Sequence, residues 1–475
     1  MLTGVITDSN KNLPFMRFIL LFVISLLPFV ASAQGVAQKR AARLGLGVNL
    51  SYLEGYWNGT KARHFSDFVK LNEVPIRRQR MADIARAGFK TVRIPVCFGA
   101  WASVNPPYEW DAPQYLAVPD SLVRWALANN LTAIIDLHHV EFDGSIKGAD
   151  STARVVWLWQ QIAERYKNTD PERVLFELRN EPHDMTATAW RTQATKLIQT
   201  VRQIAPNHTL VVGFHDWNGR DALLKSAPFA DPNILYTFHF YDPFVFTHQG
   251  ATWAGSGLPD VRGVPFPGSA TTKISVPAAA RGTWIENAIN GYANEATYEV
   301  IYQRIQAAKN WSVVNEVPIF LGEFGSYNLN ADADSRCRHA EAIYVALGKF
   351  QIPSAWWEWD GGFSMFTKNS SQLMPCMQDA LTTYATGELR ILSTEPVKGA
   401  WLKVYPNPAN DAVQIESAGR PALSVEVVDA VGRTVYQLPV VNGFMCVSNW
   451  QTGNYFLRIF DQKGAMLGVS RLLKL

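Results

Sequence analysis

The chain has 475 residues, which is enough for a barrel of about 250–350 residues and a further domain. Its 48% hydrophobic and 18% charged residues are ordinary for a globular protein, and a formal net charge of only +3 gives no electrostatic reason to expect a nucleic-acid partner. The 16 tryptophans are more than core packing usually needs. Their flat indole faces suit the apolar faces of sugar rings, although many of them could equally fill core space.

The N-terminal region has the pattern of an export signal. Arg17 precedes the apolar stretch 18–30, and residues 31–33 (ASA) match an A-x-A cleavage site. The apolar stretch is too short for a membrane span, which needs about 20 residues. We expect residues 1–33 to be a signal peptide, with Met16 as an alternative start, and the protein to cross the inner membrane.

Eight short apolar segments follow, and segments with helical periodicity lie between them. The eight segments are 45–50, 91–96, 131–137, 174–180, 209–214, 234–240, 318–324 and 354–359. Several are continuously apolar, as strands buried on both faces are. Eight alternations of strand and helix predict an α/β fold, a (β/α)8 TIM barrel over residues 34–390, whose site lies at the carboxyl ends of the strands. A long insert at about 242–295, rich in Gly, Pro and aromatic residues, is expected to serve function rather than to be a passive connection.

The pattern changes after about residue 390. Short alternating strands are separated by Gly, Asn and Asp turns, which predicts a small β-sandwich over residues 391–475. This region contains no His/carboxylate cluster, so we expect no chemistry there.

The four cysteines match no zinc or redox spacing. Cys97 lies beside an expected strand, where burial would leave it inert. Cys337 and Cys376 could pair in an oxidising compartment, but the sequence alone leaves this open.

Two glutamates stand where expected barrel strands give way to loops. Glu181 lies in VLFELRNEP and Glu323 in PIFLGEFGSY. Hydrolysis of a glycosidic bond needs one protonated and one ionised carboxyl group, so this pair predicts a glycosidase. Asn180 could hydrogen-bond a sugar 2-hydroxyl; the alternative for Glu181 is a helix N-terminal acid beside Pro182.

An arginine is expected at the same depth of the barrel as Glu323. A buried carboxylate needs a partner, and Arg93 in TVRIPV would keep Glu323 ionised. The alternative is a salt bridge of purely structural value at the barrel mouth.

Further polar and aromatic side chains follow other expected strands. They are His138, His139, His239, Tyr241 and Trp357. A metal site is the rival explanation for the histidines, but no H-E-x-x-H or comparable spacing supports it. We therefore expect no metal and no cofactor.

These motifs together resemble glycoside hydrolase family 5, a family of retaining (β/α)8 cellulases and mannanases. The similarity covers roughly residues 40–385 and depends on TVRIPV, IIDLHH, LFELRNEPH, TFHFYDP, FLGEFG and AWWEWDGGF in the family's order. The resemblance implies that Glu181 is the acid/base and Glu323 the nucleophile. It also implies substrate-side roles for Arg93, His138, His139, Asn180, His239, Tyr241 and Trp357.

One branch of that family has an additional likeness. FVFTHQGATW is similar to a segment of a branch with broad endoglucanase and mannanase activity, which implies that His248 and Trp253 line the substrate cleft. Glu54 in NLSYLEG matches that branch's sugar-binding acid, although the loop before it is one residue shorter here.

The C-terminal region resembles the type A sorting domain of the type IX secretion system. The likeness depends on VYPNPANDAVQIES, VVDAVGRTVY, GNYFLRI and SRLLKL, and it implies export with this secretion machinery as a partner. The alternative is a carbohydrate-binding sandwich, but this region has only Trp401 and Trp450 and no row of aromatic residues.

The resulting hypothesis is a secreted, monomeric, retaining endo-β-glycanase. β-1,4-Glucan (cellulose or mixed-linkage glucan) is the expected substrate; mannan, glucomannan and xyloglucan stay open, as does release or attachment at the cell surface. The rivals are a non-catalytic polysaccharide-binding protein on the same barrel, and an enzyme of other chemistry, for which no metal ligands or phosphate-binding loop are evident.

Overall fold

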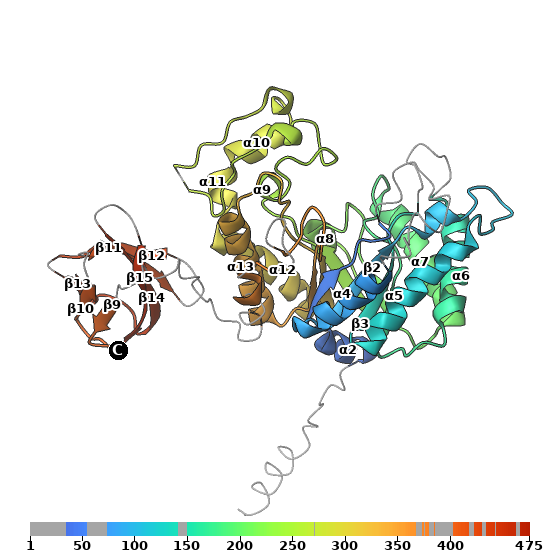
Figure 1. Ribbon diagram of the computed structural model, residues 1–475, viewed down its shortest axis with the longest axis horizontal. Coiled ribbons are helices and arrows are strands. Elements are labelled where there is room, and N and C mark those ends of the chain that lie inside the picture. Colours follow the sequence, from blue (N-terminus) through green and yellow to red (C-terminus); the bar gives the residue numbers. More distant parts are fainter. Residues whose placement is uncertain are drawn as a thin grey trace, which may run out of the picture. The chain divides into compact units, whose positions relative to one another are not determined.

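The computed structural model describes residues 35–54, 74–140, 150–269, 271–366, 373–374, 376–379, 384, 402–417, 422–429, 434–441, 443–461 and 466–475. The expected signal peptide lies outside the described residues. The prediction of a TIM barrel followed by a small β domain is confirmed, because eight parallel strands close into a barrel and two antiparallel sheets follow (Figure 1).

The barrel strands occur in chain order around the barrel, and β1 pairs with both β2 and β8. They are β1 (Leu46–Asn49), β2 (Thr91–Val96), β3 (Thr132–Leu137), β4 (Val174–Glu177), β5 (Leu210–Val212), β6 (Ile234–His239), β7 (Ile319–Glu323) and β8 (Ser354–Trp356). Every residue of these strands is buried, which explains their continuously apolar sequences.

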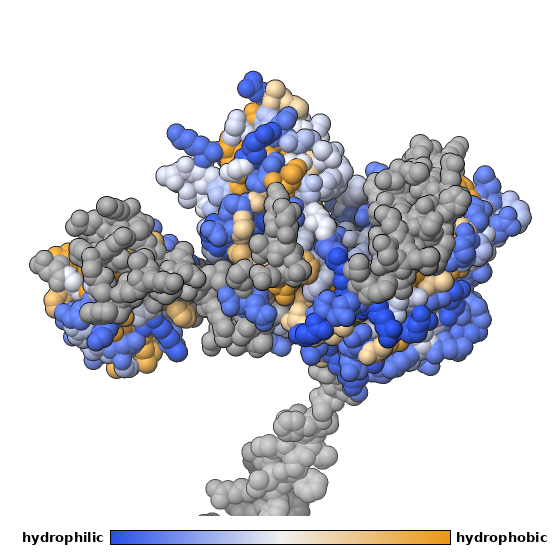
Figure 2. Space-filling view, in the orientation of Figure 1, coloured by the Kyte–Doolittle hydropathy of each residue, from blue (hydrophilic) through white to orange (hydrophobic). Residues whose placement is uncertain are grey.

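Helices connect the strands on the outside of the barrel. They are α4 (Val74–Arg86), α5 (Ala117–Ala128), α6 (Thr152–Tyr166), α7 (Ala187–Ile204), α8 (Arg220–Lys225), α12 (Tyr298–Val314) and α13 (Ala333–Phe350), with short 3-10 helices η1 (Phe98–Trp101) and η2 (Pro113–Leu116) after β2. Their surface is mostly hydrophilic in the view of Figure 2. The first turns of α7, α12 and α13 are capped by Thr186, Thr297 and Asp332, whose side chains accept backbone hydrogen bonds.

A helix that precedes β1 closes the amino-terminal end of the barrel. This helix, α2 (Val36–Leu44), packs Ala41 and Leu44 against one buried side chain from each of six strands. Those six are Ile134, Leu175, Val211, Leu235, Phe320 and Ala355. Arg40 fixes the helix by bonding Glu172 and Thr209, so the barrel has a packed floor.

The long insert between β6 and α12 is a folded unit and stands on the carboxyl-terminal face (Figure 1). It contains α9 (Phe244–Thr247), η3 (Leu258–Asp260), η4 (Ala278–Ala280), α10 (Trp284–Asn290) and α11 (Tyr292–Glu295). Buried apolar side chains hold it together: Leu258, Val261, Val264, Phe266, Ile285 and Ile289.

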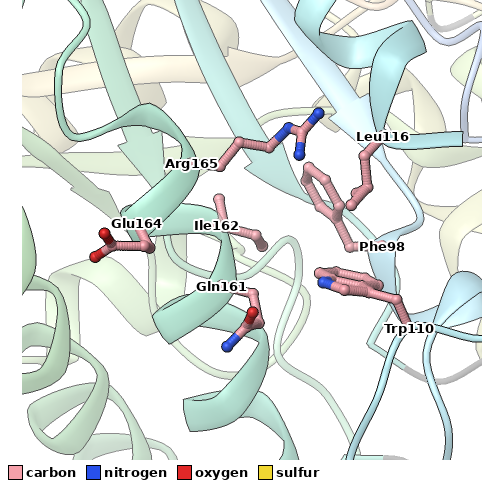
Figure 3. A pocket seen from close by; sticks show the side chains of 7 residues that line it. All are labelled: Phe98, Trp110, Leu116, Gln161, Ile162, Glu164 and Arg165. Carbon is pink, nitrogen blue, oxygen red and sulfur yellow. The ribbon is translucent and has the colours of Figure 1, made fainter. Parts of the chain in front are cut away.

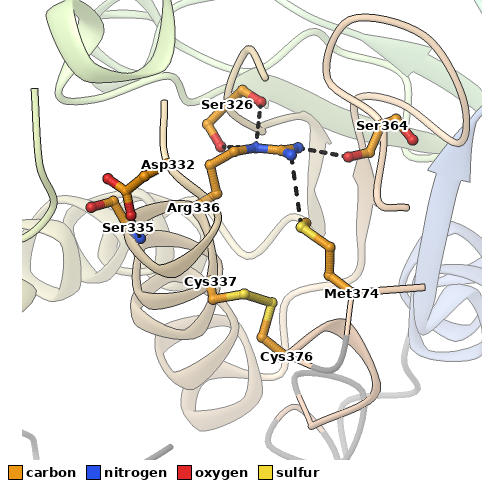
Figure 4. Close-up of a disulfide and its surroundings, with 8 residues drawn as sticks. All are labelled: Ser326, Asp332, Ser335, Arg336, Cys337, Ser364, Met374 and Cys376. Carbon is orange, nitrogen blue, oxygen red and sulfur yellow. Dashed lines mark hydrogen bonds between the residues drawn. A yellow bond between two sulfur atoms is a disulfide. The ribbon is translucent and has the colours of Figure 1, made fainter. Parts of the chain in front are cut away.

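Two loops at this face are tied together near α13 (Figure 4). Cys337 and Cys376 form a disulfide, which settles the pairing that the sequence left open. The buried guanidinium of Arg336 donates to Ser326 of the loop after β7, to the carbonyl of Ser364 after β8 (2.6 Å), and to the sulfur of Met374. The loops after β7 and β8 therefore share one support.

The C-terminal domain has a core of its own. Its sheets are β13-β10-β9 and β12-β11-β14-β15, formed by β9 (Leu402–Tyr405), β10 (Ala412–Ser417), β11 (Ala422–Asp429), β12 (Thr434–Pro439), β13 (Phe444–Cys446), β14 (Gly453–Asp461) and β15 (Met466–Lys474). Trp450 is only 8% exposed and stacks on Tyr436, so it is a core residue. Trp401 lies outside the described residues. In the part of the chain that is described, no helix is long and apolar enough to cross a membrane.

Candidate active site

Arg93 is the centre of the buried polar network at the barrel mouth. Its side chain is 0% exposed, and its Nη1 lies 2.6 Å from Glu323 Oε1 and 2.9 Å from Asn49 Oδ1. Nη2 donates to Asn180 Oδ1 at 2.8 Å. The prediction that Arg93 lies beside Glu323 is confirmed by this geometry.

Two further carboxylates share the same guanidinium. Nε and Nη2 of Arg93 donate to both oxygens of Glu177 at 2.7 and 2.9 Å, and Asp136 Oδ2 lies 3.0 Å from Nη2. Asp136 and Glu177 are neighbours on β3 and β4. Burial raises the pKa of both carboxyl groups, that of Asp136 to about 7.

Glu323 ends β7 and is held by two donors. Besides Arg93, the hydroxyl of Tyr241 donates to its Oε2 at 3.0 Å. Burial raises the pKa of Tyr241 well above its ordinary value, so it stays a protonated donor at neutral pH. Glu323 itself is 4% exposed.

Glu181 lies in the turn after β4 and not on a strand. The apolar segment was expected to run to residue 180, but β4 ends at Glu177. Glu181 has φ 39°, a left-handed backbone that side-chain-bearing residues seldom adopt. Its Oε1 lies 2.6 Å from His239 Nδ1, and the same nitrogen is 3.6 Å from Glu323 Oε2.

The two candidate acids are close together. An oxygen of Glu181, an oxygen of Glu323 and a nitrogen of His239 all lie within 4.8 Å of one another. Burial raises the pKa of both carboxyl groups to about 7. Only Glu323 has direct bonds from Arg93 and Tyr241, so Glu323 ionises first and Glu181 keeps its proton. Burial lowers the pKa of His239 to about 4, which leaves the imidazole neutral.

His138 and Trp357 form one wall of the site. The two rings are nearly parallel, 10° apart, with centroids at 5.5 Å. Asp136 Oδ2 lies 2.6 Å from His138 Nδ1, and burial lowers the pKa of this histidine. Trp357 directly follows β8 and is half-buried, so part of its ring can meet a ligand.

His139, Glu54 and Glu358 lie beside this wall. His139 Nε2 is 3.4 Å from Glu54 Oε1, so the structure brings together His139, which the family resemblance implied, and Glu54, which the likeness to one branch implied. Glu358 is 7% exposed, accepts a bond from Ser51, and burial raises its pKa to about 7.

Among the residues that the structure describes, two groups have the composition and spacing to hold a metal ion. They are Glu54 with His138 and His139, and Glu181 with His239 and Glu323. In both groups an imidazole nitrogen is already engaged by a carboxylate, Asp136 or Glu181. The second group contains Glu181 and Glu323, the two acids that the sequence analysis singled out.

His248 and Trp253 are on the insert, on the Tyr241 side. The ring of His248 contacts that of Tyr241 with centroids 5.0 Å apart, and burial lowers its pKa to about 3. Trp253 is 59% exposed and meets Tyr327 edge to face at 5.0 Å. Both lie on the mouth side of the barrel, as expected for residues of a cleft.

The loop after β5 presents a tryptophan that the sequence did not single out. Trp217 is 53% exposed, and its indole stacks on the His183 ring at 3.8 Å with the planes 3° apart. His183 Nδ1 donates to the carbonyl of Glu181 at 2.7 Å. Asp216, Trp217 and Asn218 all have positive φ, so the loop turns tightly. The turn brings Asn218 against Gly213, where an added Cβ would lie 1.5 Å from Asn218 Oδ1, so this position requires glycine.

A separate cavity of about 230 Å³ lies on the flank of the barrel between η1, η2 and α6 (Figure 3). Its lining residues are Phe98, Trp110, Leu116, Gln161, Ile162, Glu164 and Arg165. The two charged residues among them are already paired, Arg165 with Asp120 and Glu164 with Lys167. It contains no residue of the mouth network, so the chemistry is assigned to the mouth.

The comparisons with known proteins agree with this geometry. Residues 55–362 match the cellulase family, glycosyl hydrolase family 5, and residues 403–468 match the secretion system C-terminal sorting domain. Endoglucanase 3 of Fibrobacter succinogenes is 30% identical over 304 residues, which cover 59% of this chain and 46% of that protein. The matched region thus spans less than half of that relative.

Other similar proteins are matched over nearly their whole length. Endoglucanase C of Acetivibrio thermocellus is 27% identical over 324 residues, 66% of this chain and 90% of that protein. Structures of Cel5A from Thermotoga maritima, solved with cellobiose and with mannotriose, are 27% identical with a TM-score of 0.57 and cover 72% of this chain and 99% of theirs. The chain belongs to the cellulase family, glycosyl hydrolase family 5, and carries a C-terminal secretion-system sorting domain.

Proposed function

We propose that the protein is a secreted retaining endo-β-1,4-glucanase in which Glu181 is the acid/base and Glu323 the nucleophile. The observation that carries the proposal is the short distance between their oxygens, within 4.8 Å. Retaining glycosidases have carboxyl groups about 5–5.5 Å apart, whereas inverting enzymes need about 6.5–9.5 Å to admit a water.

The reaction proceeds in two displacements. Glu181 protonates the glycosidic oxygen while Glu323 attacks the anomeric carbon, which gives a glycosyl ester and releases the shortened chain. Glu181, now a carboxylate, takes a proton from water, and the water oxygen attacks the anomeric carbon and frees Glu323. Ester formation removes the charge of Glu323, so the pKa of Glu181 falls when its role changes from acid to base.

The residues around Glu181 and Glu323 set the position and the protonation state of each carboxyl group. Arg93 and Tyr241 keep Glu323 ionised and oriented. His239 holds Glu181 at 2.6 Å, and Asn180, fixed by Arg93, is placed to bond the 2-hydroxyl of the reacting sugar.

Aromatic and polar groups on both sides of the pair would bind the chain. Trp357 would stack under the sugar that reacts, with His138, His139 and Glu54 beside it. His248 and Trp253 would line the cleft on the insert side. Trp217, next to Glu181, would support the departing part of the substrate.

Glucan is proposed as the main substrate because the similar proteins from Fibrobacter and Acetivibrio are endoglucanases. Mannan or glucomannan is the second candidate, because Thermotoga maritima Cel5A has been solved with mannotriose as well as with cellobiose.

Export and domain limits are also part of the proposal. Residues 1–33 would direct passage through the inner membrane, residues 34–390 would form the catalytic domain, and residues 391–475 would direct export by the type IX machinery to the medium or the cell surface. The match to a secretion sorting domain at 403–468 supports this division. We propose that the enzyme acts as a monomer without a cofactor.

The test is product analysis of the purified protein on carboxymethylcellulose, barley β-glucan, glucomannan and mannan. We expect rapid loss of viscosity on glucans and a β-anomeric first product by ¹H NMR. Glu181→Gln and Glu323→Gln should each lower kcat/KM at least about 100-fold, because each removes an obligatory proton carrier or nucleophile.

Folding of the two variants is checked by thermal unfolding. A variant that folds and keeps substantial activity would refute its assignment. A wild-type protein that binds glycans but cleaves none would favour the non-catalytic alternative.

A further inference from the structure

The insert carries an exposed aromatic residue outside the acid pair and the cleft residues around it. Trp284, at the start of α10, is 50% exposed, which is a large fraction for a tryptophan. It meets Phe244 edge to face with ring centroids 5.5 Å apart. Phe244 stacks on His248 at 3.9 Å with planes 6° apart, and His248 contacts Tyr241.

A second run of rings starts from the same tyrosine. The ring centroid of Phe363 lies 5.9 Å from that of Tyr241 and 5.4 Å from that of Tyr327. The ring of Tyr327 in turn contacts that of Trp253. Both runs begin at the residue that donates to Glu323, and both end on a tryptophan that is at least half exposed.

The two exposed tryptophans belong to one small region of the insert. Gly255 is two residues after Trp253, and a Cβ built on Gly255 would lie 3.5 Å from Trp284 Cζ2. Gly255 has φ 143°, so a side chain there would be strained as well as close to the indole. The loop after Trp253 therefore passes beside the indole of Trp284.

The region is held rigidly enough to present a surface. Thr283 caps α10 by accepting from the backbone N–H of Ile285, and Glu286 accepts from that of Gly282 at 2.7 Å. Ile285, the neighbour of Trp284, is 1% exposed and anchors the helix in the core of the insert. The indole of Trp284 is thus fixed at its base and half exposed.

We propose that Trp253 and Trp284 form a distal binding surface for the same β-linked glucan chain that is cleaved at Glu181 and Glu323. The inference rests on the proposed function and extends it, since it assigns a residue of the insert to sugar units remote from the cleaved bond. A rigid indole face matches the apolar face of a pyranose ring and costs little conformational entropy. Contacts of this kind favour long chains over short ones.

The experiment compares a long and a short substrate on the full-length protein. For each variant, kcat/KM is measured on cellohexaose and on p-nitrophenyl-β-cellobioside, and the ratio of the two values is the readout. We expect Trp284→Ala to lower this ratio about 5-fold, through KM on cellohexaose, because one aromatic contact of about 1 kcal/mol is lost. Trp284→Phe should keep most of the wild-type ratio, because an aromatic ring is retained.

Trp157→Ala is the matched control, since this half-buried tryptophan on α6 contacts Trp110 on the flank of the barrel. Its ratio should equal that of the wild type, and thermal unfolding checks that each variant is folded. An unchanged ratio in Trp284→Ala, or an equal fall in the control, overturns the distal surface. A wild type inactive on both substrates overturns the proposed function instead.

Discussion

Arg93 carries one positive charge and faces three carboxylates that are buried with it. Glu177, Asp136 and Glu323 all lie within 3.0 Å of its guanidinium nitrogens. A single cation cannot balance three buried anions, so at least one of these groups must hold a proton. Asp136, whose pKa is raised to about 7, is the group best suited to do so, because its Oδ1 is buried without a hydrogen-bond partner among the described residues.

The acid limb of the pH profile should depend on Tyr241. Activity needs ionised Glu323 and protonated Glu181, so kcat/KM should be bell-shaped around neutral pH. Tyr241→Phe removes a donor that stabilises the charged form of Glu323, so the pKa of this carboxyl rises. The acid limb should move to higher pH by about one unit. The measurement is kcat/KM against pH on a soluble glucan.

His215 offers a control for this experiment, because it lies on the loop after β5 and takes no part in the Arg93 network. The profile of His215→Ala should coincide with that of the wild type. An acid limb in Tyr241→Phe that stays in place, or moves to lower pH, would show that the hydroxyl does not stabilise the anion of Glu323.

We expect Glu177 to contribute strongly to the free energy of unfolding, although it is distant from the reacting bond. Its carboxylate makes a bidentate pair with Arg93 at 2.7 and 2.9 Å, and both side chains are 0% exposed. Glu177→Ala would remove two charge-assisted hydrogen bonds of the buried guanidinium and leave its Nε–H without its partner, which costs about 3–5 kcal/mol of the free energy of unfolding. Urea denaturation measures this loss, and Glu316→Ala, at a surface position, serves as control. A loss below about 1 kcal/mol would mean that Asp136 compensates fully.

The sequence was sufficient to predict that Glu181, Glu323 and Arg93 lie together, but it did not single out every residue of the network around them. Glu323 was recognised because a carboxylate that ends an apolar strand needs a partner. The same argument applies to Asp136 in IIDL and Glu177 in VLFE, and it would have found both. Trp217 could not have been found in this way, because its role depends on a loop geometry with three successive left-handed residues.

Among the elements, the barrel strands were predictable because burial on both faces makes their sequences continuously apolar. The segment 91–96 agrees with β2 at both ends, whereas the expected strand 174–180 is longer than β4. The extra residues are Leu178, which belongs to the hydrophobic core, Arg179, which donates to Gln193, and Asn180, which accepts from Arg93. An apolar sequence indicates burial, and both burial and backbone hydrogen bonds to the neighbouring strands continue beyond Glu177, the last residue of β4.

The disulfide should support the loops after β7 and β8. It links α13 to a segment 39 residues further along the chain, next to the bonds that Arg336 makes to both loops. Replacing Cys337 and Cys376 by Ser should lower the free energy of unfolding by about 2–4 kcal/mol. Denaturant unfolding of the oxidised protein gives the value.

Cys446→Ser is the matched control for the disulfide, because this cysteine is free and exposed in the C-terminal domain. It should unfold like the wild type. If the double Ser variant did so too, the crosslink would contribute nothing to the stability of the barrel.

For the whole molecule, the barrel and the C-terminal domain each have a hydrophobic core. A protein that ends at residue 390 should therefore keep the kcat/KM of the full chain on p-nitrophenyl-β-cellobioside within about 2-fold, while losing export in a host with the type IX machinery. Activity assays on the purified proteins and on culture medium test both parts. A truncated barrel that fails to fold would show that the second domain also supports the first.

Because α2 closes one end of the barrel, the two ends are not equivalent as points for attaching the enzyme to a solid support. The apolar contacts of α2 with six strands and the bonds of Arg40 close the end opposite the carboxyl-terminal face that bears Glu323 and the insert. A flexible linker joined at Gly35 would hold the catalyst by its closed end, with the mouth turned away from the support and open to long polymers. A linker within the insert would hold it by the surface that those polymers must reach.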